Sequence, residues 1–360
     1  MPTKRSKLPI LLLILVAVAA FIALHSMRHV STPQELERRY AAEGALYNRP
    51  IFATGGGYSG MCIFNDQIMS VSSSGLVRSG SSSGSNLKWT VLSNLSLDVD
   101  LVRVVATSDG LIATGSHGIY HSIDGVKWRV LSSQFNCTQG LVALPNGDYL
   151  AAGEDGLVRG LDHGQFWVKD RSVPKIHSQV PKEVQDLDDP TEAQEAARKI
   201  DLKTNSVVQA RCPATAIAVS GKRVAVGFSS GDVILSEDGG TNWKLLPQPV
   251  DAWINAIAFY HGEIWATTPK FFWTWEEGHW SKYPLPIVAK SPVKEPTVIR
   301  QIIVDQGTIY FIGKGVFSLN RDTGNTWQQL SEKSWNCGIM TKNGLILGGN
   351  TMPPQTVSAQ

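Results

Sequence analysis

The chain has few of the residues that build metal and redox centres. Its 360 residues include four cysteines and eight histidines. No two cysteines form a CxxC pair, and the histidines do not have the spacing of metal ligands. No glycine-rich phosphate loop leads from a strand into a helix. The sequence therefore points to no metal site and no cofactor, and we expect none.

A strong net charge is missing as well. The 33 lysines and arginines nearly balance the 31 aspartates and glutamates, which leaves a net charge of +2. Basic residues form no run beyond the N-terminus. Proteins that bind nucleic acid usually present a broad basic field. We therefore predict no nucleic-acid partner.

The N-terminal segment differs from the rest of the chain. Lys4, Arg5 and Lys7 precede an apolar run over residues 8–24, which is close to the minimum of about 17 residues that spans a bilayer. We predict that residues 1–28 form a cytoplasmic tip and a transmembrane signal anchor. The flanking positive charge then places the remaining chain in the periplasm or another extracytoplasmic space. A cleaved signal peptide is the alternative.

A helical spacer is predicted for residues 29–46. Thr32 is a suitable N-cap, Pro33 fits the first helical turn, and Glu35 lies three residues after the cap. These three residues form the signature of a capping box.

A hairpin that ends on a tryptophan recurs along the chain. Each unit contains four short apolar segments separated by glycine-containing turns, with a period of about 35–47 residues, which is typical of a propeller blade. Six full units end at Trp89, Trp128, Trp167, Trp243, Trp280 and Trp327.

The two ends of the repeat region are incomplete. Residues 335–349 supply two strands of a seventh unit, and residues 47–54 look like a spare strand that could complete it and remove exposed sheet edges. We predict an all-β fold: a seven-bladed β-propeller of four-stranded blades with an N-terminal transmembrane helix. The propeller would span residues 47–350, followed by a tail over 351–360. Six and eight blades are the lesser alternatives.

One insertion, over residues 171–208, interrupts the period between the third and fourth units. Asp189 and Pro190 mark a helix start within it. It is either a solvated excursion or a partner-binding arm or lid, since long insertions in compact folds are often functional.

The closing turns carry a recognisable motif. The stretch Ser236–Trp243 follows the pattern Ser-x-Asp-x-Gly before a tryptophan, and Ser122–Trp128 follows it with glycine directly after the aspartate. The pattern resembles the Asp-box, or bacterial neuraminidase repeat. The resemblance implies that the aspartate holds the turn between the third and fourth strands of a blade. It gives structural roles to Asp124, Asp162, Asp238, Asp322, Trp128, Trp243 and Trp327.

Residues 50–350 as a whole resemble the photosystem II assembly and stability factor family of propellers. That resemblance implies a membrane-anchored, extracytoplasmic scaffold or assembly factor that binds protein in a membrane-associated complex and is not an enzyme. The alternative is a sialidase-like propeller that hydrolyses or binds glycans, because sialidases also carry Asp-boxes.

Arginines at the starts of first strands are the candidate binding residues. Arg103, Arg211 and Arg300 hold this position, and Asn255 has a similar place in its repeat. They are either solvated channel residues or contacts for an acidic peptide on the funnel face. A sialidase needs such arginines together with a tyrosine–glutamate pair and a carboxylic acid. No such pair stands out, so we assign no catalytic residue.

The four cysteines also share a position near the start of a first strand. An oxidising compartment would permit disulfides, with Cys62 paired to Cys337 and Cys137 paired to Cys212 in neighbouring blades. The alternative is four small buried apolar side chains.

The run Phe271–Trp273 contains more aromatic residues than one blade needs. We predict that the run Trp265–Trp280 is mostly repeat core, and an exposed aromatic patch for a partner is the alternative.

Overall fold

The computed structural model describes most of the repeat region. All the described residues belong to the larger of the two units into which the chain divides, residues 49–360. The described ranges are residues 58–72, 75–81, 88–95, 100–174, 176, 213–247, 253–287, 298–320, 326–349 and 355–357. The predicted anchor, spacer, spare strand and insertion helix lie outside them. Within these ranges, no helix has the length and apolar character needed to cross a membrane.

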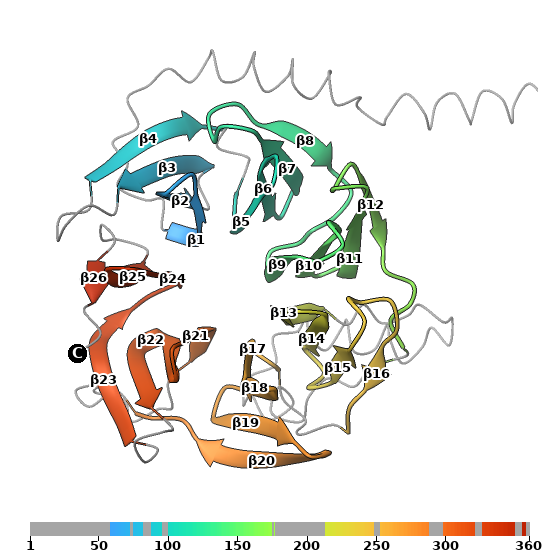
Figure 1. Ribbon diagram of the computed structural model, residues 1–360, viewed down its shortest axis with the longest axis vertical. Coiled ribbons are helices and arrows are strands. Elements are labelled where there is room, and N and C mark those ends of the chain that lie inside the picture. The colour runs from blue at the N-terminus through green and yellow to red at the C-terminus, as the bar shows by residue number, and fades with distance from the viewer. Residues whose placement is uncertain are drawn as a thin grey trace, which may run out of the picture. The chain divides into compact units, whose positions relative to one another are not determined.

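Five antiparallel sheets have four strands each, in chain order (Figure 1). Blade 1 comprises β1 (Tyr58–Phe64), β2 (Gln67–Ser72), β3 (Leu76–Ser81) and β4 (Lys88–Asn94). Blade 2 comprises β5 (Arg103–Thr107), β6 (Gly110–Gly115), β7 (Gly118–Ser122) and β8 (Arg129–Ser132). Blade 3 comprises β9 (Gly140–Ala143), β10 (Tyr149–Gly153), β11 (Gly156–Leu161) and β12 (Phe166–Lys169). Blade 4 comprises β13 (Ala214–Ser220), β14 (Arg223–Phe228), β15 (Val233–Ser236) and β16 (Lys244–Leu245). Blade 5 comprises β17 (Ala256–Tyr260), β18 (Glu263–Thr267), β19 (Phe271–Glu276) and β20 (His279–Pro284).

Two further sheets have three strands. Blade 6 comprises β21 (Ile299–Asp305), β22 (Thr308–Asn320) and β23 (Thr326–Ser334). The first half of β22 pairs with β21 and its second half pairs with β23, so this one strand takes the place of the two middle strands of other blades. The closing sheet comprises β24 (Cys337–Thr341), β25 (Gly344–Gly348) and β26 (Gln355–Val357).

The prediction of seven four-stranded blades is therefore wrong, and the predicted N-terminal transmembrane helix lies outside the described residues. Six blades correspond to the six tryptophan-terminated units, and the remaining strands form only the three-stranded closing sheet. No helix is found among the described residues. Strand β26 comes from residues 351–360, which we had placed outside the propeller. Its three residues are too few to show the alternation that identifies a strand in sequence.

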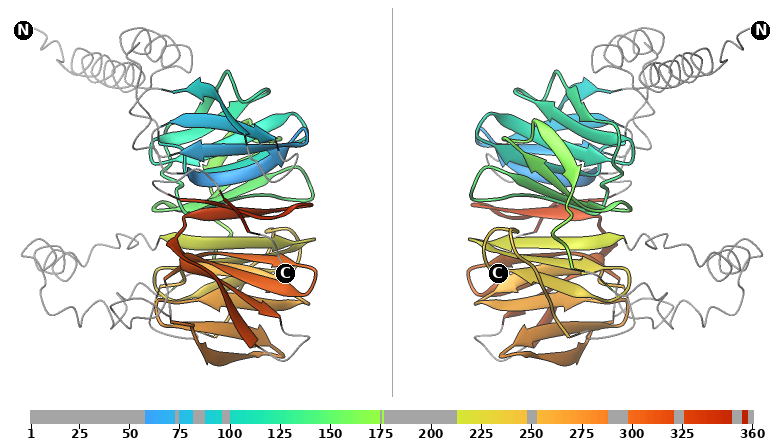
Figure 2. Two further views of the ribbon diagram at one scale, coloured as in Figure 1. Left: turned by 90° about the vertical axis from the view of Figure 1, so that its left-hand side faces the viewer. Right: turned by 90° about the vertical axis from the view of Figure 1, so that its right-hand side faces the viewer.

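The middle strands are buried on both faces because each sheet packs between two others. All six residues of β6 and all five of β10 are buried, whereas none of the four residues of the outer strand β8 and only one of the four in β12 is buried. Two packed sheets need apolar side chains on both facing surfaces, which explains the continuous apolar runs of the second and third strands. Figures 1 and 2 show the sheets around a common axis.

The first blade closes the ring against the closing sheet. The backbone N–H of Tyr58 donates to the carbonyl oxygen of Gly349 over 3.1 Å. The side-chain amide of Asn336 donates to the carbonyl oxygen of Tyr58 over 3.2 Å. Strand β1 therefore lies beside β24, although the two are far apart in sequence (Figure 1).

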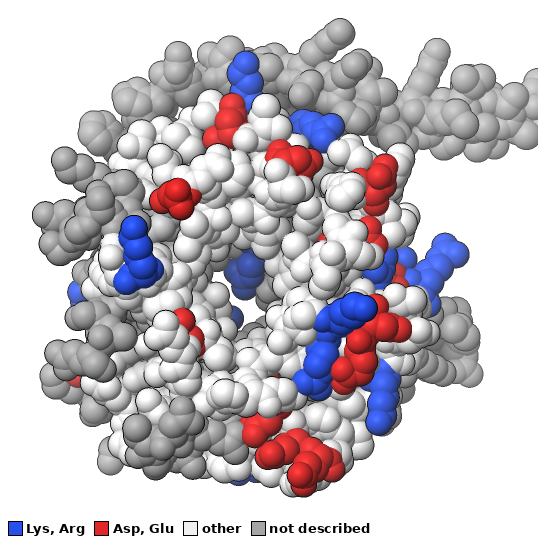
Figure 3. Space-filling view, in the orientation of Figure 1, with Lys and Arg blue, Asp and Glu red and all other residues white. Residues whose placement is uncertain are grey.

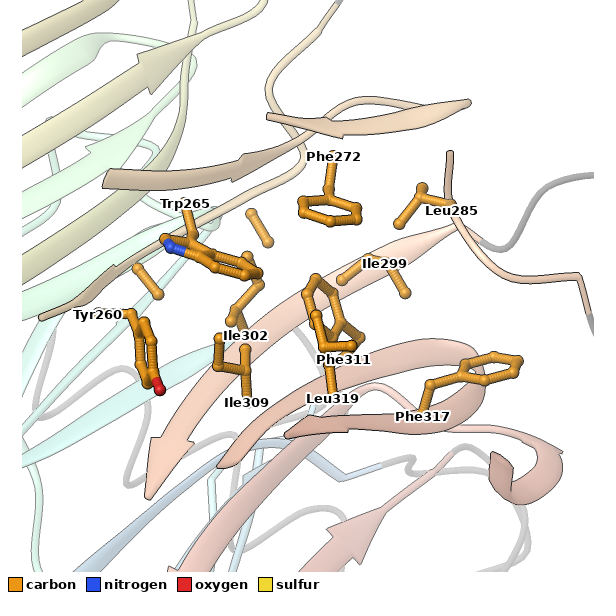
Figure 4. Close-up of a cluster of buried hydrophobic side chains, with 12 residues drawn as sticks. Tyr260, Trp265, Phe272, Leu285, Ile299, Ile302, Ile309, Phe311, Phe317 and Leu319 are labelled. Atoms are coloured by element: carbon orange, nitrogen blue, oxygen red, sulfur yellow. The ribbon is translucent and has the colours of Figure 1, made fainter. Parts of the chain in front are cut away.

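Aromatic side chains fill the interface between blades 5 and 6. Trp265 and Phe272 from blade 5 meet Phe311 and Phe317 from blade 6 in one buried cluster (Figure 4). Phe272 and Trp273 are 5% and 7% exposed. The structure therefore agrees with the predicted repeat core and not with the alternative of an exposed patch at Phe271–Trp273, because two of its three rings lie in the sheet interior.

Arginine joins neighbouring blades at the periphery. Arg159 of blade 3 forms an ion pair with Asp170, with 3.0 Å between Nη2 and Oδ2, and donates to the carbonyl oxygen of Gly240 in blade 4. Arg223 of blade 4 likewise donates to Gly262 of blade 5. Each guanidinium satisfies a turn carbonyl of the next blade and fixes the spacing of the two sheets.

Glycine occurs where the segment that enters a blade packs so closely against the second strand that no side chain fits. A Cβ on Gly115 would lie 1.7 Å from the carbonyl oxygen of Asp100, and one on Gly313 would lie 1.8 Å from that of Val298. Gly115 ends β6, and Gly313 lies within β22 where its pairing with β21 ends; both lie against the segment that leads into the first strand. No side chain fits there, which explains part of the glycine content of the repeats.

Candidate functional site

The inner strands of all seven sheets surround a central cavity of about 280 Å³. Figure 3 shows its opening at the centre of the face, with basic side chains inside. Each sheet turns the start of its first strand toward this space. The polar side chains that line it are those of Ser59, Arg103, Gln139, Thr215, Asn255, Arg300 and Gln301.

Local irregularities place three of these side chains. The pairing of the first and second strands shifts register at Ser59 in blade 1, at Thr215 in blade 4 and at Arg300 in blade 6. A β-bulge inserts one extra residue and re-aims its side chain. Otherwise apolar first strands can therefore present a polar residue to the cavity.

Arg103 links three blades across the wall of the cavity. Its Nη1 donates to the carbonyl oxygen of Ser59 over 3.0 Å, and its Nε donates to that of Gln139 over 3.2 Å. Burial lowers the pKa of the Arg103 guanidinium, and the nearby Cys337 thiol partly opposes this shift. An arginine in a protein nonetheless stays charged, so Arg103 combines a structural bond with a fixed positive charge.

Arg300 and Gln301 add hydrogen bonds between blade 6 and the closing sheet. Its Nη1 donates to the side-chain oxygen of Asn336, whose amide in turn bonds the carbonyl oxygen of Tyr58. Gln301 exchanges two hydrogen bonds with the backbone of Gly338, over 2.8 and 3.3 Å. Arg300 itself is exposed. These hydrogen bonds therefore connect the closing sheet to blades 6 and 1. Part of the Arg300 side chain remains open to the cavity.

The described wall of the cavity is positively charged. Among the described residues that line it, two are arginines and none is Asp, Glu, His or Tyr. A sialidase would need a tyrosine nucleophile and acidic partners, which are not gathered here. The wall can attract and hydrogen-bond an anionic group.

The structure brings together three of the four predicted binding residues. Arg103, Asn255 and Arg300 all line the cavity, whereas Arg211 lies outside the described residues. The sequence analysis missed Gln139 and Gln301. Both lie at the start of a first strand, as the predicted residues do, so the same position in the repeat could have identified them.

The turn of blade 2 is held by Asp124. Its Oδ1 accepts the backbone N–H groups of Val126 over 2.8 Å and Lys127 over 3.0 Å. These two bonds lower the pKa of the carboxyl group. The indole of Trp128 donates to the carbonyl oxygen of Gly125 over 3.0 Å. The Asp124 carboxylate and the Gly125 carbonyl thus accept hydrogen bonds from N–H groups of a turn that does not pair with a neighbouring strand.

Asp238 has the same place in blade 4. It accepts the backbone N–H and the side-chain amide of Asn242, over 2.8 and 2.7 Å, and the hydroxyl of Ser236 over 2.8 Å. Bonds from Asn242 lower its pKa from 3.8 to about 2. The indole N–H of Trp243 donates instead to the hydroxyl of Ser172, over 3.1 Å.

The other two predicted aspartates differ. Asp162 adopts a left-handed backbone with φ of 50°. Its turn is held by the backbone bond from Gln165 to the Asp162 carbonyl oxygen, over 3.1 Å. Asp322 lies outside the described residues. Trp327 packs against Phe272 and Phe311 in the core between blades 5 and 6.

Replacing Asp238 by asparagine is expected to lower stability at neutral pH. Because the folded-state pKa lies below the ordinary value, the ionised carboxylate stabilises the fold above about pH 4, and this contribution is lost as the pH falls toward 2. Urea unfolding should show a difference between wild type and Asp238→Asn that shrinks from pH 4 to pH 2. Asp162→Asn serves as the control, because a backbone hydrogen bond holds its turn, and it should change stability little. A pH-independent difference for Asp238→Asn would contradict this role.

The described cysteines are free and buried. Cys62, Cys137 and Cys337 carry free thiols. The structure therefore does not contain the predicted Cys62–Cys337 disulfide, and Cys212 lies outside the described residues. Burial raises the pKa of all three thiols to about 12. They match the alternative of small buried side chains.

These thiols are expected to resist alkylation in the folded protein. The thiolate is the reactive form, and a pKa of about 12 leaves almost none of it at neutral pH. Native protein treated with N-ethylmaleimide should gain no label at Cys62, Cys137 or Cys337 by peptide mass spectrometry, whereas urea-unfolded protein should be labelled at all three. Rapid native labelling of Cys337 would refute this burial.

Comparisons with known proteins agree with the propeller fold. A solved structure described as "YCF48 bound to D1 peptide" superposes with a TM-score of 0.58 at 14% identity, over 85% of this chain and 94% of that one. The WD40 domain of Neurospora crassa Pan2 gives a TM-score of 0.55 at 12% identity, over 87% and 95%. No family model matches, and no curated protein matches. At these identities the likeness shows the β-propeller fold, and the Asp-box assignment stays a prediction.

Proposed function

We propose that this propeller is a protein-binding scaffold or assembly factor that holds an acidic segment of its partner at the central cavity. The observation that carries the proposal is the cavity wall itself. It gathers Arg103, Arg300 and Asn255 from three blades and has no carboxylate among its described lining residues. A basic, partly enclosed surface focuses the field on an anionic group.

The structural neighbours support the same class of function. One is a propeller whose description includes a bound peptide. The β-propeller is used by proteins of many functions, so this support is by analogy, and the residues of this chain's own cavity carry the argument.

The proposed place of action is next to a membrane, with the propeller on the extracytoplasmic side and the partner in a membrane-associated complex. The support comes from sequence: Lys4, Arg5 and Lys7 precede the apolar segment 8–24. Recovery of the full chain in an alkaline-washed membrane fraction, with the propeller open to protease from the outside, would support this placement. Recovery in the cytoplasmic fraction would contradict it.

Replacing Arg300 by glutamine is expected to weaken partner binding. The change removes the exposed charge of the cavity, and a hydrogen bond to a charged group is worth enough to reduce affinity roughly tenfold. The partner recovered by crosslinking in native membranes should decrease accordingly. Arg171→Gln is the matched control, because Arg171 is exposed but does not line the cavity.

Two results would count against the proposal. Equal recovery of the partner with Arg300→Gln and Arg171→Gln would exclude the cavity as its contact. Turnover of a fluorogenic sialoside, abolished by Arg103→Ala or Arg300→Ala, would replace the scaffold by the glycan-hydrolysing alternative.

A further inference from the structure

A second cavity, of about 130 Å³, lies between blades 5 and 6. Its walls come from β18, β19 and β20 on one side and from β22 and β23 on the other. Figure 4 shows Trp265 and Phe272 facing Phe311 and Leu319 in the adjoining cluster. The residues that line this interblade pocket are Trp265, Phe272, Thr274, Tyr283, Pro284, Leu319 and Trp327.

The aromatic rings form two walls at a steep angle. Phe272 stacks between Trp265 and Tyr283, with interplanar angles of 12° and 13° and centroid distances of 5.3 and 4.8 Å. Trp327 stands at 77° to Phe272. Aromatic pairs favour both offset stacking and edge-to-face contact. A further ring could pack against the edge of this stack and against Trp327.

One polar group lies within this apolar pocket. Thr274 is 2% exposed, and its side chain lines the pocket. It points to the same side of the sheet as Trp265, the residue directly opposite it on β18. Its hydroxyl makes no hydrogen bond to any described residue. Buried hydroxyl groups usually have a partner, so Thr274 points to a ligand that brings one.

We propose that the interblade pocket accepts a tyrosine side chain of a protein partner. The ring would fill the corner formed by Phe272 and Trp327, and its phenolic hydroxyl would bond Thr274. The size is suitable, since an apolar cavity of about 150 Å³ holds a benzene ring. A buried aromatic anchor in a well-packed pocket is typical of the residues that dominate protein interfaces.

The pocket is a poor fit for a sugar. A sugar ring carries several hydroxyl groups, and each would need a hydrogen-bonding partner. Thr274 and the half-exposed Tyr283 are the only hydroxyl-bearing residues among the described lining side chains. A phenol needs only one bond, which matches the single buried hydroxyl of the pocket, that of Thr274. This inference rests on the proposed protein-binding function and names a second contact for the same partner.

The first test uses two small probes, p-cresol and toluene, titrated into the full chain by saturation-transfer NMR. The wild type should bind p-cresol saturably and roughly 2- to 10-fold more tightly than toluene, the difference that one hydrogen bond supplies. Thr274→Val keeps the shape and removes the hydroxyl. It should abolish the preference for p-cresol and leave toluene binding within about twofold of wild type.

Thr114→Val is the matched control. Thr114 is buried in blade 2, and its hydroxyl also lacks a hydrogen bond in the described structure. This variant should keep the wild-type preference. Leu319→Phe should fill the pocket and remove binding of both probes. If Leu319→Phe does not fold, as judged by circular dichroism, the comparison of Thr274→Val with Thr114→Val decides alone.

Absence of saturable binding of both probes to the wild type would overturn the inference. So would an unchanged preference in Thr274→Val, or tighter binding of methyl β-galactoside than of p-cresol. A partner that is captured through the cavity but is indifferent to Thr274→Val and to p-cresol would also overturn it, with the scaffold function intact. Failure to capture any partner, with probe binding as described above, would instead count against the scaffold function.

Discussion

Replacing Arg159 by leucine is expected to lower the free energy of unfolding by about 3–5 kcal/mol. The Arg159 and Asp170 side chains are 14% and 4% exposed, and Arg159 also bonds the Gly240 carbonyl of the next blade. Removing the guanidinium leaves the buried Asp170 carboxylate with its bonds from Ser172 but without a counter-charge, and leaves the Gly240 carbonyl without this donor. Urea unfolding at neutral pH measures the loss.

The ion pair of Arg223 with Glu237 provides the control. Its side chains are 29% and 62% exposed, and an exposed pair contributes about 1 kcal/mol or less. Arg223→Leu should therefore cost much less than Arg159→Leu. The double variant Arg159→Leu/Asp170→Leu should recover part of the loss, since no buried charge remains. Equal losses of unfolding free energy for Arg159→Leu and Arg223→Leu would show that the contact between blades 3 and 4 stabilises the fold no more than the exposed ion pair does.

Replacing Gly313 by alanine is expected to cost about 3 kcal/mol or more, at the upper end of overpacking effects. The new Cβ would lie 1.8 Å from the carbonyl oxygen of Val298. Both atoms belong to backbone that is fixed by strand pairing, so neither can move away without breaking the ladder of blade 6. Thermal and urea unfolding of the purified variant report the change.

Gly278→Asn is the comparison for Gly313→Ala. Gly278 has a φ of 88°, and no atom lies within 4 Å of the position that a Cβ would occupy. Asparagine tolerates left-handed backbone better than other residues, so this variant should lose about 1 kcal/mol or less. A Gly313→Ala protein as stable as Gly278→Asn would mean that the entry segment of the blade can shift.

The repeat pattern predicted the propeller and the strands of the six units, because the second and third strands are buried on both faces and read as apolar runs. It also predicted that Arg103, Arg300 and Asn255 occupy equivalent places. Residues at the same position in successive repeats lie at equivalent places around the ring. The shared position of these three residues at the start of a first strand was therefore enough to predict their equivalent places.

Other features depend on contacts that no local pattern records. Strand β26 has three residues and is recognised only by its pairing with β25. Phe272 is in the interior because it packs in the aromatic cluster between blades 5 and 6. The role of Gly313 depends on a carbonyl oxygen fifteen residues earlier in sequence, which becomes visible only in three dimensions.

The measurement that tests the proposed binding at the central cavity most directly is photo-crosslinking from within it. A photoreactive amino acid at Asn255 in the full chain, activated in native membranes, should form an adduct with one polypeptide through an acidic segment, and Arg300→Gln should remove most of that adduct. The same amino acid at Lys244, an exposed position on the outer strand β16, should not form it. An adduct from position 244 and none from 255, or an adduct unaffected by Arg300→Gln, would contradict binding at the cavity.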